Sequence, residues 1–172
     1  RTPVREAIRK LELEGLVVML PRKGAYVANI SVKDLMDVLE IRASLEGLGA
    51  SLAAERRTEE DIKNLEEIEE EFEQAVITQD IDMLLKKDIE FHECIFKAAN
   101  NKKLEKMINS LWEQVQRFRI TYVSDSNASL SLIDEHRIIL NAIKEGNVAD
   151  GKKAAIEHIE KAEQFMLDHC TK

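Results

Sequence analysis

Residues 2–14 read Thr-Pro-Val-Arg-Glu-Ala-Ile-Arg-Lys-Leu-Glu-Leu-Glu, and residues 15–29 continue Gly-Leu-Val-Val-Met-Leu-Pro-Arg-Lys-Gly-Ala-Tyr-Val-Ala-Asn. Thr2 is a good N-cap, and Pro3 suits the first helical position because its missing N–H costs nothing there. Apolar residues recur on one helical face as far as Gly15, which ends the predicted helix. Residues 16–20 and 25–29 then read as two short strands joined by a basic turn at 21–24. A helix followed by such a hairpin is the pattern of a DNA-binding wing.

From Ser31 onward the sequence predicts helices only, at roughly 31–55, 58–78, 80–99, 101–123, 129–145 and 148–169. Two helix starts have the form of capping boxes, Ser31 with Asp34 and Thr58 with Asp61, in which Asp replaces the usual Glu. The helices are separated by short polar breaks, among them the Ser- and Asn-rich residues 124–131. No heptad repeat is sustained, so the pattern predicts a globular bundle. The expected fold is mainly α, with a helix and hairpin in residues 1–30 and about six helices in residues 31–172.

The composition is that of a globular chain, with 44% hydrophobic and 34% charged residues among 172. No run of about 18 apolar residues occurs, so no membrane span is predicted. Cys94 and Cys170 form no metal or redox motif, and a reducing cytoplasm is the simplest interpretation. Residues 1–30 hold six basic and three acidic side chains, so they carry +3 of a net charge of −8 and the remainder carries −11. This asymmetry indicates that only the N-terminal segment meets a polyanion.

The candidate DNA contacts lie at the start of the first helix and at the hairpin tip. A recognition helix offers side chains from its first turns to bases and phosphates, and Arg1, Thr2 and Arg5 share about the same face there. Arginine can donate two hydrogen bonds to guanine, and threonine can contact a thymine methyl group or a phosphate. Lys23 and Gly24 could approach the backbone or the minor groove. Charge alone fits a solvated basic surface equally well.

Four ionisable residues interrupt the apolar stripes of the later helices: Asp88, His92, His136 and His158. Asp88 and His92 are one helical turn apart and share a face, so all four groups are expected to point into one bundle interior. One carboxylate and three imidazoles suit a borderline divalent metal such as zinc or nickel, which would offset the cost of burying the acid. Each histidine taken alone fits an ordinary core residue, and spacing does not decide between the two interpretations.

Arg42 and Arg119 also lie within apolar stripes. Each could clamp a carboxylate effector, and each could instead form a structural salt bridge with one of the many glutamates. The acidic run Glu66–Glu73 is interpreted as a solvated helix face without function. His169 lies eleven residues beyond His158, about 16 Å along the axis at 1.5 Å per residue, so it is expected at the surface and outside the metal site. Cys94 is expected to serve packing.

Residues 1–17 and the Pro-Arg-Lys-Gly-Ala-Tyr-Val-Ala segment at 21–28 resemble the recognition helix and wing of GntR-family transcription regulators. The resemblance implies that residues 1–30 are the C-terminal part of a winged helix-turn-helix domain, whose first two helices are not in this chain. The chain by itself is then expected to bind DNA poorly or not at all. It also implies a homodimer that reads a palindromic operator in double-stranded DNA, because two-fold proteins read two-fold sites.

A second resemblance covers residues 31–170. It rests on Arg42-Ala-Ser-Leu-Glu46 with Ala53-Ala54, Asp88-Ile-Glu-Phe-His92, Glu135-His136-Arg-Ile-Ile-Leu-Asn-Ala-Ile143, and His158. Together these resemble the FCD ligand-binding domain of the FadR-type GntR subfamily. The resemblance implies an all-helical effector domain in residues 31–172, with a divalent metal held by the aspartate and three histidines. It also implies a small carboxylate effector, for which Arg42 and Arg119 are the candidate contacts.

Two other classes of protein remain as alternatives. A metal in a helical bundle could belong to a di-iron oxidase or a hydrolase, but the sequence lacks Glu-x-x-His, His-Glu-x-x-His, a Gly-rich phosphate loop and Gly-x-Ser-x-Gly. A catalytic role is therefore not expected. A purely structural metal would stiffen the bundle, and it predicts a saturated coordination sphere with no response to small molecules.

Overall fold

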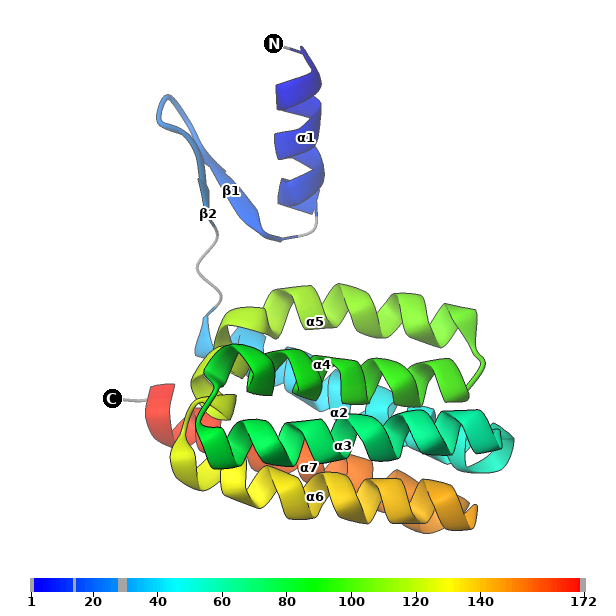
Figure 1. The fold of residues 1–172 in the computed structure, drawn as a ribbon. Helices are drawn as coiled ribbons and strands as arrows, with labels where there is room; N and C mark the ends of the chain where they lie inside the picture. The colour runs from blue at the N-terminus through cyan, green and yellow to red at the C-terminus, as the bar shows by residue number, and fades with distance from the viewer. Residues whose placement is uncertain (1, 14, 28–30, 171–172) are drawn as a thin grey trace.

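The computed structural model of the chain describes residues 2–13, 15–27 and 31–170, which form a small N-terminal unit and a helical bundle (Figure 1). In Figure 1 the N-terminal unit stands beyond one side of the bundle, next to α5. The elements in chain order are α1 (Thr2–Leu13), β1 (Val17–Leu20), β2 (Gly24–Val27), α2 (Val32–Arg56), α3 (Glu59–Thr78), α4 (Ile81–Ala98), α5 (Lys102–Val123), α6 (Ser126–Glu145) and α7 (Val148–Cys170).

The predicted helix and hairpin are confirmed. Gly15 ends α1 with a φ of +75°, a conformation that suits glycine. The strands β1 and β2 pair antiparallel, with Val17 opposite Val27 and Leu20 opposite Gly24. Thr2 is the first helical residue of α1 rather than its cap, β1 begins one residue later than expected, at Val17, and β2 begins one residue earlier, at Gly24. The predicted strand residues 28 and 29 lie outside the described residues.

Side-chain caps fix where the bundle helices begin. Both predicted capping boxes are confirmed, at Ser31 for α2 and at Thr58 for α3. The predicted start of α6, at residue 129, was wrong, because the helix begins three residues earlier. Asp125 accepts hydrogen bonds from the backbone N–H groups of residues 127 and 128, so the helix begins at Ser126. The Ser- and Asn-rich stretch that predicts a loop therefore contains a helix cap and the first helical turn.

Apolar side chains of the described residues form two large clusters along the bundle, and a smaller third cluster contains Phe96, Leu104, Ile108 and Trp112. One large cluster contains Leu35, Leu39, Leu84 and Ile159, and the other is built around Ala50, Ala53, Ile95, Ile139 and Ala155. On α2, α4, α6 and α7, the buried polar residues lie in the sequence between members of the two clusters. A polar layer thus crosses an otherwise apolar core.

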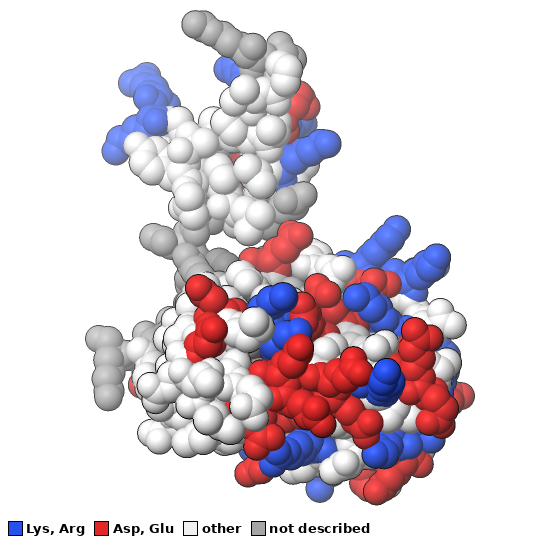
Figure 2. Space-filling model, in the orientation of Figure 1, with Lys and Arg blue, Asp and Glu red and all other residues white. Residues whose placement is uncertain are grey.

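The bundle surface is acidic on one face. Figure 2 shows red side chains spread over the side on which α3 lies, whereas the N-terminal unit presents blue side chains at its extremities. The exposed acids of α3 are Glu59, Glu60, Glu67, Glu70 and Glu71. No helix in the described ranges has the length and apolar character needed to cross a membrane.

Glycine permits close packing of α2 against α7. A Cβ atom added at Gly47 would lie 2.7 Å from Ile156 Cγ1 and 3.2 Å from the carbonyl oxygen of Lys152. At Gly151, also within a helix, the nearest atom would be 3.5 Å away, which is ordinary contact. A side chain at position 47 would therefore collide with α7, whereas position 151 has room for a methyl group.

We expect Gly151→Ala to stabilise the chain by up to about 1 kcal/mol, because alanine favours helix and meets no obstruction. Gly47→Leu should destabilise it by about 2 kcal/mol through overpacking against α7. Urea unfolding followed by circular dichroism measures both. Equal effects of the two substitutions would contradict the close approach at Gly47.

Candidate metal centre

The four predicted ligands come together in the polar layer. Asp88 and His92 lie one turn apart on α4, His136 comes from α6 and His158 from α7. All four side chains are buried, with 0 to 4% of their surface exposed. One nitrogen from each histidine lies within 4.8 Å of the others. The structure thus brings the predicted set together, as a group of side chains with the donor chemistry of a divalent metal site.

Each imidazole is held by a glutamate from another part of the bundle. The Nδ1 atoms of His92, His136 and His158 lie 3.2, 3.2 and 2.9 Å from carboxylate oxygens. The partners, in the same order, are Glu46, Glu69 and Glu135. An ionised carboxylate can only accept a hydrogen bond, so Nδ1 carries the proton, and in a neutral ring Nε2 then presents a lone pair. This is the arrangement in which proteins orient metal-binding histidines.

The Nε2 atoms of the three histidines lie close enough together for one cation to contact all of them. His158 Nε2 lies 3.3 Å from His92 Nε2, and with both protons on Nδ1 no hydrogen joins these two acceptors. His136 Nε2 is buried and has no hydrogen-bond partner. Nitrogens bound to one zinc at about 2.0–2.1 Å lie roughly 3 to 3.5 Å apart, which matches the His92–His158 distance. A divalent cation would satisfy all three lone pairs, so the residues present fit such an ion.

Asp88 adds a negative charge beside these nitrogens. Its Oδ1 atom is 3.6 Å from His136 Nε2 and 4.0 Å from His92 Nε2, while its Oδ2 atom is 3.2 Å from Arg119 Nε. Burial raises the pKa of Asp88, but the charge of Arg119, followed by electrostatic interactions with the histidines, outweighs burial and holds it below its usual range. The carboxylate is therefore ionised at neutral pH, with one oxygen directed toward the histidines.

The electrostatics keep His92 ready to donate its lone pair. Burial lowers the pKa of His92 to about 4, against the opposing pull of Glu46, so the ring is neutral at pH 7. Burial alone would raise the pKa of Glu46, but His92 and Arg42 together hold it below its usual range. Glu46 also accepts hydrogen bonds from Arg42 Nη2 at 2.9 Å and from Trp112 Nε1 at 3.1 Å. Neutral imidazole is the form that binds metals.

Aromatic rings fix the orientation of His136. Phe91 stacks on it with ring centroids 4.1 Å apart, and Phe72 contacts it at 4.7 Å with the ring planes tilted. Both phenylalanines are fully buried. The His136 ring thus has little freedom to turn Nε2 toward another partner.

Sequence reasoning missed the three glutamates as site residues. The interpretation of Glu66–Glu73 as a solvated face was wrong for Glu69, which is 4% exposed and contacts His136, because one side of α3 faces the core. Helical spacing carried the signal, since Glu69 lies four residues after Leu65 and three before Phe72, both buried. Glu46 and Glu135 belong to the segments that carry the FCD resemblance, but no role was predicted for them.

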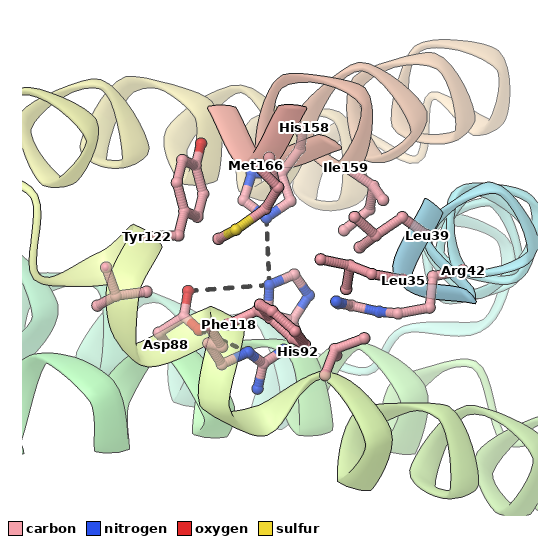
Figure 3. Close-up of a pocket in the computed structure, with 14 residues that line it drawn as sticks. Leu35, Leu39, Arg42, Asp88, His92, Phe118, Tyr122, His158, Ile159 and Met166 are labelled. Atoms are coloured by element: carbon pink, nitrogen blue, oxygen red, sulfur yellow. Dashed lines mark hydrogen bonds and ion pairs between the residues drawn. The ribbon is translucent and has the colours of Figure 1, made fainter. Parts of the chain in front are cut away.

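Both predicted effector arginines line a cavity beside the histidines and also form salt bridges. Arg42 pairs with Glu46 at 2.9 Å and Arg119 with Asp88 at 3.2 Å, so both arginines form the kind of salt bridge that was the alternative to effector binding. One group remains open, because Arg42 Nε is buried without a hydrogen-bond partner. The cavity reaches from Arg42, Asp88, His92 and His158 to apolar side chains of α2, α5 and α7 (Figure 3). The centres of water molecules have about 30 Å³ available in it.

The predicted DNA contacts are far less enclosed. The side chains of Arg5 and Lys23 are exposed, and Gly24 has a φ of +99° at the turn of the hairpin. Thr2 begins α1, and Arg1 lies outside the described residues. The contribution of these residues to DNA binding stays a prediction.

Two residues set aside by the sequence reasoning behave as expected. His169 is exposed on α7, where its ring stacks on Phe165 at 3.9 Å, and it is not part of the histidine cluster. Cys94 is buried in the second apolar cluster, and burial raises the pKa of its thiol to about 11. An un-ionised buried thiol serves packing rather than reactivity.

Comparisons with known proteins agree with this architecture. The FCD domain family model matches residues 37–161. The HTH-type transcriptional regulator LutR of Bacillus subtilis (strain 168) is 30% identical over 186 residues, covering 96% of this chain and 84% of that protein. The solved structure of E. coli McbR/YncC superposes with a TM-score of 0.86 at 23% identity, over 98% of this chain and 85% of that one. The solved structure of Streptococcus agalactiae GntR superposes with a TM-score of 0.64 at 24% identity, over 95% of this chain and 81% of that one.

We expect Arg119→Met to destabilise the metal-free chain by about 3 kcal/mol, because it leaves the buried carboxylate of Asp88 without its cation. The double variant Asp88→Leu/Arg119→Met should lose less, since it removes both charges. Urea unfolding monitored by circular dichroism at pH 7 gives both values. Additive losses in the double variant would show that the two side chains are not energetically coupled.

Proposed function

Because this chain belongs to the GntR family of transcription regulators, in the branch with an FCD domain, we propose that its bundle binds a divalent metal and a small carboxylate effector that modulates operator binding. Its relatives are DNA-binding regulators and not enzymes, so the metal would serve sensing and not turnover. The observation that carries the proposal is the set of three buried imidazoles, each oriented by its own glutamate, whose Nε2 atoms face one another.

The metal would be held by Asp88, His92, His136 and His158. Zinc or nickel fits three imidazoles and one carboxylate better than magnesium or calcium, which prefer oxygen ligands. When bound, such an ion supplies a positive centre that can attract an effector carboxylate. The glutamates behind the histidines keep the rings in place, and Arg119 holds Asp88 in its orientation.

The effector would bind beside the metal, in the cavity that Arg42 and Arg119 line. Arg119 already uses its Nε atom on Asp88, whereas Arg42 keeps a buried Nε–H without a partner. We therefore assign Arg42 as the principal carboxylate contact, with Arg119 positioning Asp88. An arginine next to a metal provides two attractive charges for one carboxylate.

Operator binding would follow from linkage between the two ends of the molecule. In a homodimer, each N-terminal unit would present the start of α1 to one half of a palindrome, with Arg5 near the bases and Lys23 near the backbone. An effector shifts the dimer only if it binds one spacing of these units better than another. The bundle face is acidic and the N-terminal unit basic, which favours DNA contact by the latter alone.

Metal binding should stabilise the chain. We expect chelator-stripped protein to gain about 5 to 10 °C in melting temperature at zinc concentrations near 100 times Kd, because the ion binds the folded state. His92→Ala and His158→Ala should abolish the gain, as each removes one ligand. Differential scanning calorimetry with zinc, nickel and manganese checks this and ranks the metals.

Two matched controls separate ligation from general effects. His169→Ala removes an exposed histidine from the same helix as His158 and should leave the zinc response unchanged. Glu69→Gln should weaken zinc binding about 10- to 100-fold, whereas Glu70→Gln, an exposed neighbour, should not. If none of the three metals changed the melting temperature of the chelator-stripped chain, the proposed metal site would be refuted.

Contact with DNA should depend on the basic tips of the N-terminal unit. Arg5→Gln and Lys23→Gln are each expected to reduce the slope of log affinity against log salt by about one, because on a random-sequence duplex each removes one positive charge that neutralises a phosphate. Fluorescence anisotropy with a random-sequence duplex at several salt concentrations measures the slope. Lys63→Gln, which removes an exposed charge from α3, should leave it unchanged. A similar loss for Lys63→Gln would place the contact on the bundle.

A further inference from the structure

We propose that the effector is a short monocarboxylate with an apolar body, aliphatic or aromatic, and not a polyhydroxylated sugar acid. This inference rests on the proposed function, since it concerns the ligand of the same cavity. It follows from how polar and apolar side chains divide the cavity wall, from which polar groups are already occupied, and from the space available.

The polar side chains that line the cavity gather at the metal centre. They are Arg42, Asp88, His92, Arg119 and His158. The rest of the lining is apolar apart from the tyrosine Tyr122, and it comes from three helices, with Leu35 and Leu39 on α2, Val115 and Val123 on α5, and Ile159 and Met166 on α7. Figure 3 shows Leu35, Leu39, Ile159 and Met166 with His92 and His158 around the same space. A ligand whose carboxylate lies at the metal centre therefore places its body against aliphatic side chains.

The cavity offers few partners for ligand hydroxyl groups. His92, His158 and Asp88 each already contact a glutamate or an arginine. Tyr122 lines the cavity, and its hydroxyl points away from Asp88 in Figure 3. A sugar acid carries more hydroxyl groups than this one phenol can meet, so most of them would be buried without a hydrogen bond. Methylene groups at the same positions gain about fourfold in affinity each from burial.

One polar group is free to fix the carboxylate. Arg42 is 4% exposed, lines the cavity, and has its Nε–H without a partner. A carboxylate oxygen at this point would satisfy it and lie on the metal side of the cavity. The ligand is thereby oriented with its charged end at Arg42 and its other end toward Met166.

Space limits the length of the apolar body. About 30 Å³ is open to the centres of water molecules, which corresponds to roughly two water positions. A ligand of several carbons must therefore displace side chains. Met166 is suited to this because its unbranched thioether side chain has three rotatable bonds. The apolar body of the ligand is consequently short, and its length is limited by how far the Met166 side chain can move.

The test compares two acids with the same number of carbons. Hexanoate and gluconate each have six carbons and one carboxylate, but only gluconate carries hydroxyl groups. We expect the zinc-loaded chain to bind hexanoate at least tenfold more tightly than gluconate, with affinity rising from acetate through butyrate to hexanoate. Isothermal titration gives the affinities, and the fluorescence of Trp112, which contacts Glu46, gives a second readout. Hexanol controls for binding without a carboxylate.

A pair of matched variants locates the apolar body. Met166→Gln places an amide in the cavity at nearly constant volume and should weaken hexanoate at least tenfold without changing zinc affinity. Met107→Gln makes the same change at a position that is 57% exposed and should have no effect. If gluconate bound as tightly as hexanoate, the inference of an apolar body would be wrong, but the proposal that the chain senses a carboxylate would stand. Failure of every acid to bind, with zinc bound, would overturn both the inference and the proposed effector.

Discussion

The carboxylate of Asp88 lies in the centre of the bundle, and its charge must be compensated there. Arg119 of α5 provides the compensating charge, and His92 and His136 lie beside the other carboxylate oxygen. Each histidine is in turn tied to a glutamate, so that α2 is linked to α4, α3 to α6, and α6 to α7. The six helices of the described bundle thus share one network of charges and hydrogen bonds, in which removing a member leaves another buried group without its partner.

The network lies between two apolar clusters, and this position has consequences for the fold. Hydrophobic burial in the clusters is the main stabilising contribution, whereas a buried polar layer contributes little net stability and much constraint. A helix that slipped by one turn could still bury leucines and alanines. It could not still place Glu69 on His136 or Glu46 on His92. The polar layer therefore sets the register of helices that small residues such as Gly47 allow to pack closely.

The helices and the identity of the clustered residues could largely be predicted from the sequence. Capping boxes, the glycine after α1 and the apolar periodicity are local signals, and they gave nearly all helix boundaries. The errors arose where a local signal has two meanings. Ser and Asn residues mark loops and also helix starts, and only the position of Asp125 makes the stretch a helix cap. A run of glutamates marks a solvated face, but one member of any amphipathic run faces inward.

The sequence by itself determined the elements, the family and the Asp88, His92, His136 and His158 set, because helical spacing and residue type are properties of single segments. Only the tertiary structure decided which nitrogen of each histidine faces the centre, because that depends on glutamates 23 to 67 residues away. It also decided that Arg119 pairs with Asp88 and Arg42 with Glu46, while the Nε–H of Arg42 stays without a partner. Pairing among buried charges is a property of the assembled bundle, since the partners meet only when the helices pack.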